Sequence, residues 1–421
     1  MNSLLQRLMT DASRMTQDGQ LQAATEAIQR ALRAARLDGP DAAVPPAMSG
    51  TLDPMAQFES FMQRATSATG QTGFAPGAFP AGFPTGFAAG APATPHASPV
   101  VIDGCVRVID EERAQPQATP TEPSTPRAPD GARPERWTDA SFTHQGRTLA
   151  YKLFVPARAA DAPAPPLVLM LHGCTQNPAD FAAGTRMNDL ARQAGVVVVY
   201  PAQTQHANSQ KCWNWFKSQH QQRGRGEPAL LAALTQSIVA AEQVDPARVY
   251  VAGLSAGGAM ADILGHVYPD VFAAVGVHSG LPAGAATDLV SALSAMRGAP
   301  SAAPVAVRAP GTRRAPVIVF HGDADATVSP SNAAAVVKAA LDGAGAPAKA
   351  VEGRSPQGQS FTRTEHAGAD GRIAVESWTL RGAGHAWSGG SASGTYTDPR
   401  GVDASAEMLR FFLDNPRRPG D

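Results

Sequence analysis

The stretch Arg248-Val-Tyr-Val-Ala-Gly-Leu-Ser-Ala-Gly-Gly258 decides the fold of this chain. Its first half is an apolar run of the kind that forms a strand buried on both faces, and the Ala-rich segment 256–268 has the pattern of a helix. Between them, Ser255 stands in a G-x-S-x-G motif, where a sharp turn requires small neighbours. The stretch predicts a strand, a strained turn that exposes a hydroxyl, and a helix. A Gly-rich turn without chemistry is the alternative.

Similar alternation continues on both sides of this stretch. Apolar or alternating runs predict strands, and segments of helical periodicity separate them. Strands that alternate with helices require a mostly parallel sheet with right-handed crossovers, so the predicted fold class is α/β. The predicted strands are 148–156, 166–171, 196–200, 248–252, 272–277, 316–320 and 372–380, and the predicted helices are 180–194, 228–243, 256–268, 332–341 and 402–413.

Two further side chains are needed if Ser255 is a nucleophile. A Ser hydroxyl needs a His base, and the base needs a carboxylate that holds its tautomer. In α/β-hydrolases the chain order is Ser, acid, His. The segment 321–328 follows a predicted strand and offers two carboxylates, Asp323 and Asp325, and the Gly-rich turn after the next strand carries His385. This order is the one expected of a triad, and either Asp323 or Asp325 could be its acid.

The other histidines fit structural roles. His172 and His321 each end a strand in a His-Gly pair, which predicts a hydrogen bond to a neighbouring loop, and His278 is predicted to be a satisfied core or rim residue. The sequence contains no H-E-x-x-H motif and no clustered ligand spacing. We therefore expect neither a catalytic metal nor a cofactor.

An oxyanion hole completes such a site. One donor is expected to be the backbone N–H of Ala256, the residue after Ser255, and the other an N–H of the loop that follows an early strand. The segment 172–176 is such a loop, and its Cys174 amide is the predicted donor. Cys212 could pair with Cys174 and fix this loop, or the two could be unrelated buried thiols. Nearby tryptophans either form the apolar wall for an acyl chain or pack beneath the site; they are Trp213, Trp215 and Trp387.

Five motifs together resemble one family. LHGCTQNPADF, CWNWF, GLSAGGAM, FHGDADATV and GAGHAWSGG occur in this order, and the similarity spans roughly residues 141–413. They are similar to the polyhydroxybutyrate depolymerase and esterase family of α/β-hydrolases, which also includes feruloyl and acetylxylan esterases. The resemblance implies the α/β-hydrolase fold, Ser255 as nucleophile, His385 as base, Cys174 as oxyanion donor and a Cys174–Cys212 disulfide. It also favours Asp325 as the acid.

What the resemblance implies about activity is a serine esterase. The expected substrates are short-chain polyhydroxyalkanoate esters, hydrolysed through an acyl-enzyme, with feruloyl or acetylxylan-type ester hydrolysis as the alternative. Pocket shape sets this preference, and motifs do not report it. A rival of a different class is a granule-associated scaffold protein that contains a passive hydrolase domain.

Four regions are expected along the chain. Residues 1–37 have two helical periods separated by a turn and predict an amphipathic hairpin, which docks on the main domain or another copy, or lies on a hydrophobic granule surface. Residues 38–136 are a Pro/Ala/Gly-rich segment predicted to be a disordered linker. Residues 137–414 form the predicted catalytic domain, and 415–421 a tail.

Composition excludes several classes of protein. The 421 residues carry 35 Lys plus Arg against 36 Asp plus Glu, a net charge of −1, which argues against nucleic-acid binding. No apolar run reaches the roughly 18 residues of a membrane-spanning helix. The resemblance implies an extracellular location, whereas Asp11 interrupts the apolar core that a signal peptide needs, and a cytoplasmic location is the alternative. Three cysteines allow one bridge.

Overall fold

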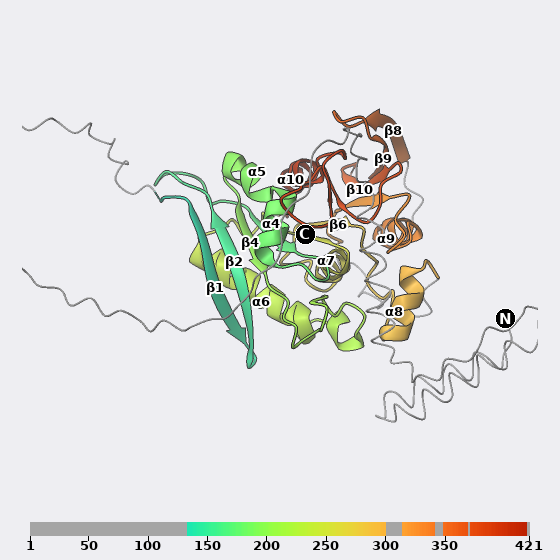
Figure 1. Cartoon of the computed structure of the whole chain (residues 1–421). Coiled ribbons are helices and arrows are strands. Elements are labelled where there is room, and N and C mark those ends of the chain that lie inside the picture. The colour runs from blue at the N-terminus through green and yellow to red at the C-terminus, as the bar shows by residue number, and fades with distance from the viewer. Residues whose placement is uncertain (1–132, 300–313, 342–347, 369–370, 419–421) are drawn as a thin grey trace, which may run out of the picture. The chain divides into compact units, whose positions relative to one another are not determined.

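A ten-stranded sheet is the centre of the computed structural model, which describes residues 133–299, 314–341, 348–368 and 371–418 (Figure 1). The strand order across the sheet is β1-β2-β4-β3-β5-β6-β7-β10-β9-β8. The strands are β1 (Arg136–His144), β2 (Arg147–Val155), β3 (Leu167–Leu171), β4 (Val197–Pro201), β5 (Val249–Leu254), β6 (Ala274–His278), β7 (Val317–Gly322), β8 (Ala348–Arg354), β9 (Ser360–Ala367) and β10 (Ile373–Leu380).

The six central strands, from β4 to β10, pair in parallel, and the strands outside them pair in antiparallel fashion. The parallel part places the carboxyl ends of β3, β5, β7 and β10 at one edge of the sheet. This confirms the predicted α/β class. Loops that follow these strands can therefore bring together residues that lie far apart in the sequence.

Helices cover both faces of the sheet, which explains why its central strands are apolar throughout. Successive residues of β3 point to opposite faces, so that Leu167 and Leu169 enter one core cluster while Val168 and Met170 enter the other. The first cluster includes residues of α6 (Gly226–Ala241), α7 (Ala256–Val267), α8 (Leu289–Met296) and α9 (Ser331–Ala340), and the second those of α4 (Pro178–Thr185), α5 (Met187–Ala194) and α10 (Ala404–Asp414).

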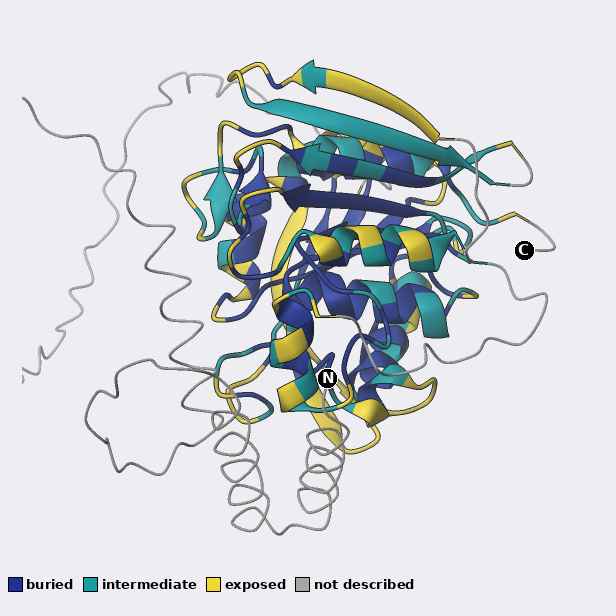
Figure 2. Ribbon diagram, turned by 90° about the vertical axis from the view of Figure 1, so that its right-hand side faces the viewer, coloured by how far each residue is buried: buried dark blue, intermediate teal, exposed yellow. Residues whose placement is uncertain are grey.

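The outer strands look different in Figure 2, where teal and yellow replace the dark blue of the centre. In β8 no residue is buried, and β9 is half-buried throughout. Such strands have neither a continuous apolar run nor a clean alternation, so their sequence does not predict them. They form because β10 offers backbone partners along its free edge.

One predicted helix was wrong. The single helix 180–194 is two helices, because Arg186 adopts a left-handed backbone (φ 55°) that ends α4 and turns the chain into α5. The domain bounds at residues 137 and 414 stay predictions. Just outside them, Arg133 pairs with Arg158, and the N–H of Arg417 donates to the carbonyl of Ala247 at 2.8 Å.

The predicted hairpin 1–37 and nearly all of the linker 38–136 lie outside the described residues, so both stay predictions. Within the described ranges, every helix is too short or too polar to cross a bilayer.

Candidate active site

Ser255 occupies the turn between β5 and α7. Its backbone (φ 57°, ψ −119°) lies in a region that residues other than glycine rarely adopt. The glycines of the motif are required by close approach: a Cβ on Gly257 would collide with the carbonyl of Leu171, and a Cβ on Gly253 would collide with Gly257. The strained turn thus presses against the end of β3, as a nucleophile elbow requires.

Asp325 and His385 meet across two loops. Asp325 lies in the turn after β7, and His385 in the turn after β10, and the Nδ1 atom of His385 lies 2.7 Å from Oδ2 of Asp325. Because the other carboxylate oxygen accepts the N–H groups of Thr327 and Val328, both at 2.9 Å, the carboxylate is held rigidly. Nδ1 of His385 therefore carries the proton, and Nε2 is left to act as a base.

Electrostatics keep Asp325 ionised. Burial raises the pKa of this carboxyl, but the charge of His385 and hydrogen bonds from His321 and His385 outweigh burial and hold the pKa well below its usual range. The Nε2 atom of His321 lies 3.4 Å from Oδ2 of Asp325 and 2.9 Å from the carbonyl of Val328. An ionised carboxylate is the form that stabilises an imidazolium.

Asp323, the other carboxylate considered, has a different place. It accepts the N–H of Gly382 at 2.6 Å and lies 3.4 Å from the guanidinium of Arg381. These contacts tie the turn after β7 to the turn that leads to His385. The structure therefore brings Asp325, and not Asp323, to the imidazole.

His278, at the end of β6, lies between the elbow and the His385 turn. Its carbonyl accepts the N–H of Ser255 at 2.9 Å, and its Nε2 accepts the N–H of Ser388 at 3.0 Å. Its ring stacks on Trp387 with 5.1 Å between centroids. Burial, together with the charges of His321 and His385, lowers the pKa of His278 to about 3, so that the ring is neutral. His278 is the satisfied core residue that the sequence predicted.

Ser255 and His385 share the sheet edge, but among the described residues no hydrogen bond joins the Ser255 hydroxyl to the imidazole. Both side chains are 6% exposed. In many enzymes this contact is long without substrate and shortens in the Michaelis complex. The structure thus forms the acid–base half of the predicted triad, and Ser255 stands at the end of a neighbouring part of the same parallel sheet.

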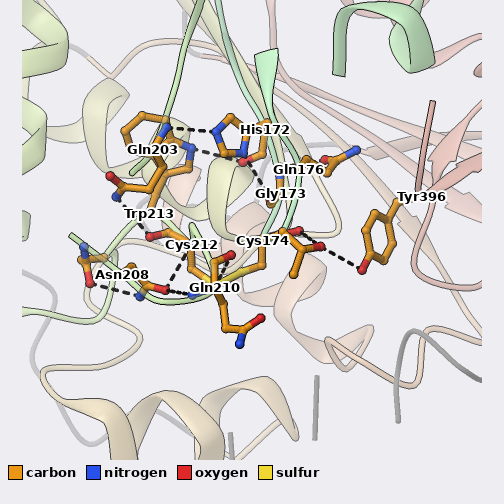
Figure 3. The surroundings of a disulfide bond; sticks show 12 residues. His172, Gly173, Cys174, Gln176, Gln203, Asn208, Gln210, Cys212, Trp213 and Tyr396 are labelled. Atoms are coloured by element: carbon orange, nitrogen blue, oxygen red, sulfur yellow. Dashed lines mark hydrogen bonds between the residues drawn. A yellow bond between two sulfur atoms is a disulfide. The ribbon is translucent and has the colours of Figure 1, made fainter. Parts of the chain in front are cut away.

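Cys174 lies in the turn after β3 and is bonded to Cys212, with 2.04 Å between the sulfur atoms (Figure 3). The disulfide prediction is confirmed. A second link joins the same segments, because the N–H of Thr175 donates to the carbonyl of Gln210 at 2.6 Å. The Oε1 atom of Gln176 accepts the N–H of Gly173 at 2.9 Å and closes the turn.

The two backbone N–H groups predicted to form the oxyanion hole have no hydrogen-bond acceptor within the described residues. In the described part of the chain, the N–H groups of Cys174 and Ala256 donate to no protein acceptor, and both residues are at most 7% exposed. Buried backbone N–H groups are nearly always paired. An oxyanion hole needs two free donors, and the candidates here are one on the residue that follows Ser255 and one in the turn after β3.

The three tryptophans near the predicted site residues in the sequence are all buried. Trp213 is 1% exposed, and its indole N–H donates to the carbonyl of His172 at 3.1 Å. Trp387 is equally buried and donates to the hydroxyl of Ser405 at 3.0 Å. Trp215, 5% exposed, packs edge-on against Phe216. Their burial favours the alternative in which the tryptophans pack beneath the site over the one in which they form the wall that contacts an acyl chain.

Sequence reasoning missed two residues at this edge. Tyr396 reaches from the segment after β11 (Trp387–Ser388) and places its hydroxyl 3.2 Å from that of Thr175. Glu227, at the start of α6, is 2% exposed and accepts hydrogen bonds from the loop that carries Cys212. A lone carboxylate at the start of an apolar helix could have drawn attention to Glu227. The hydrogen-bond partners of Glu227 could not be predicted from the sequence.

The chain is similar to known depolymerases and esterases. A family model described as esterase PHB depolymerase matches residues 149–354. Poly(3-hydroxyalkanoate) depolymerase C of Paucimonas lemoignei is 32% identical over 281 residues, 65% of this chain and 64% of that protein. Feruloyl esterase B of Neurospora crassa is 33% identical over 129 residues, 30% of this chain and 42% of that protein. The chain therefore spans less than two thirds of the length of both relatives.

The fold has a solved counterpart as well. The structure of an acetyl xylan esterase from Aspergillus awamori superposes with a TM-score of 0.50 at 21% identity, and the match covers 63% of this chain and 94% of that one. A mostly parallel sheet with helices on both faces and a Ser at a strand-to-helix elbow defines an α/β-hydrolase. Within that class, residues 149–354 match the model of the esterase PHB depolymerase family, which is the family that the chain resembles.

Proposed function

We propose that this protein is a carboxylic ester hydrolase that cleaves short-chain polyhydroxyalkanoate esters through an acyl-enzyme. The observation that carries the proposal is the 2.7 Å contact between Asp325 and His385 at the sheet edge where the elbow presents Ser255. An acid, an imidazole and a hydroxyl in this order are the elements of serine-hydrolase chemistry.

Ser255 attacks the ester carbonyl while Nε2 of His385 removes the hydroxyl proton. The negative charge that develops on the carbonyl oxygen is accepted by the N–H groups of Cys174 and Ala256. His385 then gives the proton to the leaving alcohol, which departs and leaves the acyl group on Ser255. Water, activated by the same imidazole, hydrolyses the acyl-enzyme and releases the acid. Asp325 holds the tautomer and stabilises the imidazolium.

The substrate class rests on similarity. The relative named a poly(3-hydroxyalkanoate) depolymerase aligns over 281 residues, whereas the relative named a feruloyl esterase aligns over 129. The longer alignment favours a hydroxyalkanoate ester. The second candidate, a feruloyl or acetylxylan-type ester hydrolase, shares the same machinery and differs in pocket shape.

The test measures kcat/KM of the full chain for a hydroxybutyrate oligomer, methyl ferulate and an acetylated xylan oligomer. We expect the hydroxybutyrate oligomer to be the best of the three, and preference for either of the others would assign the chain to the second candidate. Ser255→Ala should lower kcat by about 10⁵-fold with the melting temperature unchanged. Absence of hydrolysis in the wild type, or full activity in the variant, would contradict the proposal.

An oxidising, extracellular location is part of the proposal. A disulfide that closes 38 residues of chain beside the site persists where thiols are not reduced. Mass spectrometry of non-reduced peptides from native material should find Cys174 and Cys212 joined. Two free thiols would instead indicate a reducing compartment.

A further inference from the structure

A buried carboxylate outside the triad organises the loop that carries Cys212. Glu227 is the second residue of α6, and its side chain is 2% exposed. An ionised carboxylate at such a depth needs several donors, because burial without them is costly. Its place in the first turn of a 16-residue helix that packs against α7 gives it a rigid base.

Both oxygens of Glu227 accept hydrogen bonds from this loop. Oε1 accepts from Nε2 of Gln203 at 2.7 Å and from Nδ2 of Asn214 at 2.6 Å, and Oε2 accepts the backbone N–H of Asn214 at 2.7 Å. Nδ1 of His220 lies 3.3 Å from Oε2. Burial raises the pKa of Glu227, but His220 and the donors of Asn214 outweigh burial and lower it, so the carboxylate is charged. With its oxygens occupied, Glu227 cannot serve as a proton donor or acceptor for substrate.

The same donors lead directly to Cys212. Gln203 shares its Nε2 between Glu227 and the carbonyl of Cys212, the latter at 3.1 Å. Asn214 lies two residues beyond Cys212 and is held at both its backbone and its side chain. Glu227 thus fixes the chain on both sides of the disulfide.

The segment 203–214 in turn supports the turn that contains Cys174. Besides the disulfide, the backbone N–H of Gln203 donates to Nε2 of His172 at 3.1 Å, and the indole of Trp213 donates to the carbonyl of His172. Figure 3 shows these residues around the disulfide, with His172 and Cys174 on one side and Gln203 and Cys212 on the other. A shift of this loop would move Cys174 directly.

We propose that Glu227 is a positioning residue of the oxyanion hole: it holds segment 203–214 so that Cys212 keeps the Cys174 N–H where negative charge develops. The proposal rests on the esterase function proposed above. A displacement of a fraction of an ångström weakens a hydrogen bond that is made mainly in the transition state, so the loss should appear in kcat and not in KM.

The experiment replaces Glu227 by Gln, which keeps the shape but removes the charge and one acceptor. Whichever oxygen becomes the amide nitrogen, at least one donor of Gln203 or Asn214 then faces an N–H. We expect kcat for p-nitrophenyl butyrate to fall about tenfold, with KM changed by less than about twofold. Amide hydrogen exchange, followed by mass spectrometry, should rise in peptides that cover residues 172–176 and 203–214 and not in the peptide that covers 381–387.

Glu376→Gln is the matched control. Glu376 is also 2% exposed and accepts hydrogen bonds from Trp378 and Arg410, but it lies on β10, away from segment 203–214. Its replacement should lower stability to a similar degree while kcat and exchange in 172–176 stay unchanged. A similar kcat loss in both variants would show that Glu227 acts through general stability and would overturn the proposal.

Two further outcomes are decisive. If Glu227→Gln does not fold, Gln203→Met removes the donor shared by Glu227 and Cys212, and an unchanged kcat in that variant contradicts the proposal. If the wild type hydrolyses no ester, the esterase function fails, and exchange alone then judges the positioning role: unchanged exchange in 172–176 upon Glu227→Gln overturns it as well.

Discussion

The two sides of the site are built in different ways. On one side, Ser255, Asp325 and His385 follow three strands of the parallel sheet, and each stands in a short Gly-containing motif. On the other side, Cys174 is held by a segment that belongs to no strand or helix, through a disulfide and a buried carboxylate. The first side gets its geometry from strand register, and the second from side-chain contacts.

The two sides differ in how far short sequence motifs determine the positions of their residues. Strand ends are brought together by the fold itself, so a motif after each strand suffices to locate the residues. A loop has no register, and its shape depends on partners such as Glu227 that lie elsewhere in the chain. Variants on the two sides should therefore fail in different ways.

The largest effect is expected at the acid. Asp325→Asn keeps the shape but lets the other tautomer of His385 form, so kcat should fall by about 10³- to 10⁴-fold. Asp323→Asn, in the same turn and more exposed, is the matched control, and it should change kcat by less than about threefold. Steady-state kinetics on a hydroxybutyrate oligomer would compare them. Equal losses in both variants would contradict the assignment of the acid.

The disulfide should matter to stability more than to chemistry. Closing 38 residues stabilises the folded state by about 4 kcal/mol in the chain-entropy description. Cys212→Ala should therefore lower the free energy of unfolding by that order, while kcat falls by about tenfold because the Cys174 amide becomes less fixed. Urea unfolding and kinetics measure the two effects.

Cys105→Ala is the control for this change, because the third cysteine is left outside the bridge. It should leave both quantities as in the wild type. A Cys212→Ala variant with unaltered stability, or one as inactive as Ser255→Ala, would show that the two sides of the site are not held as described.

The smallest expected effect is the pH dependence of the free energy of unfolding, which involves one buried histidine on each side of the site. Burial lowers the pKa of His172, on the oxyanion side, to about 4, and that of His278, beside the triad, to about 3. Between these values and the unfolded value of about 6.5, the unfolded chain binds protons that the folded chain does not. Stability therefore rises with pH in this window and is lost on acidification.

Asp262 works in the opposite direction. Burial raises its pKa to about 6, so below that pH the folded chain holds a proton that the unfolded chain releases. From pH 6.5 to 5, the two histidines together should cost about 3 kcal/mol and Asp262 should return about 1, a net loss of about 2 kcal/mol. Urea unfolding at several pH values measures it. His278→Asn should flatten the curve and Asp262→Asn should steepen it; identical curves would refute the account.

The sequence predicted the central strands well because they are buried on both faces and show continuous apolar runs, such as Val197–Pro201. It missed β8 and β9, whose residues are exposed or half-buried and whose pairing depends on β10. Motifs after predicted strands pointed to Ser255 and His385, whereas they left Asp323 and Asp325 open until the family resemblance favoured Asp325. It could not tell whether Trp213 lines or underlies the site, because burial depends on what packs from elsewhere.

By itself, the sequence determined the class of fold, the elbow at Ser255 and the order of acid and base, because strand ends and tight glycine turns leave local patterns. Only the tertiary structure decided that Asp325 and not Asp323 reaches the imidazole, that the tryptophans are buried, and that Glu227 contacts the loop of Cys212. Those outcomes depend on contacts between residues far apart in the chain, and no local pattern records them.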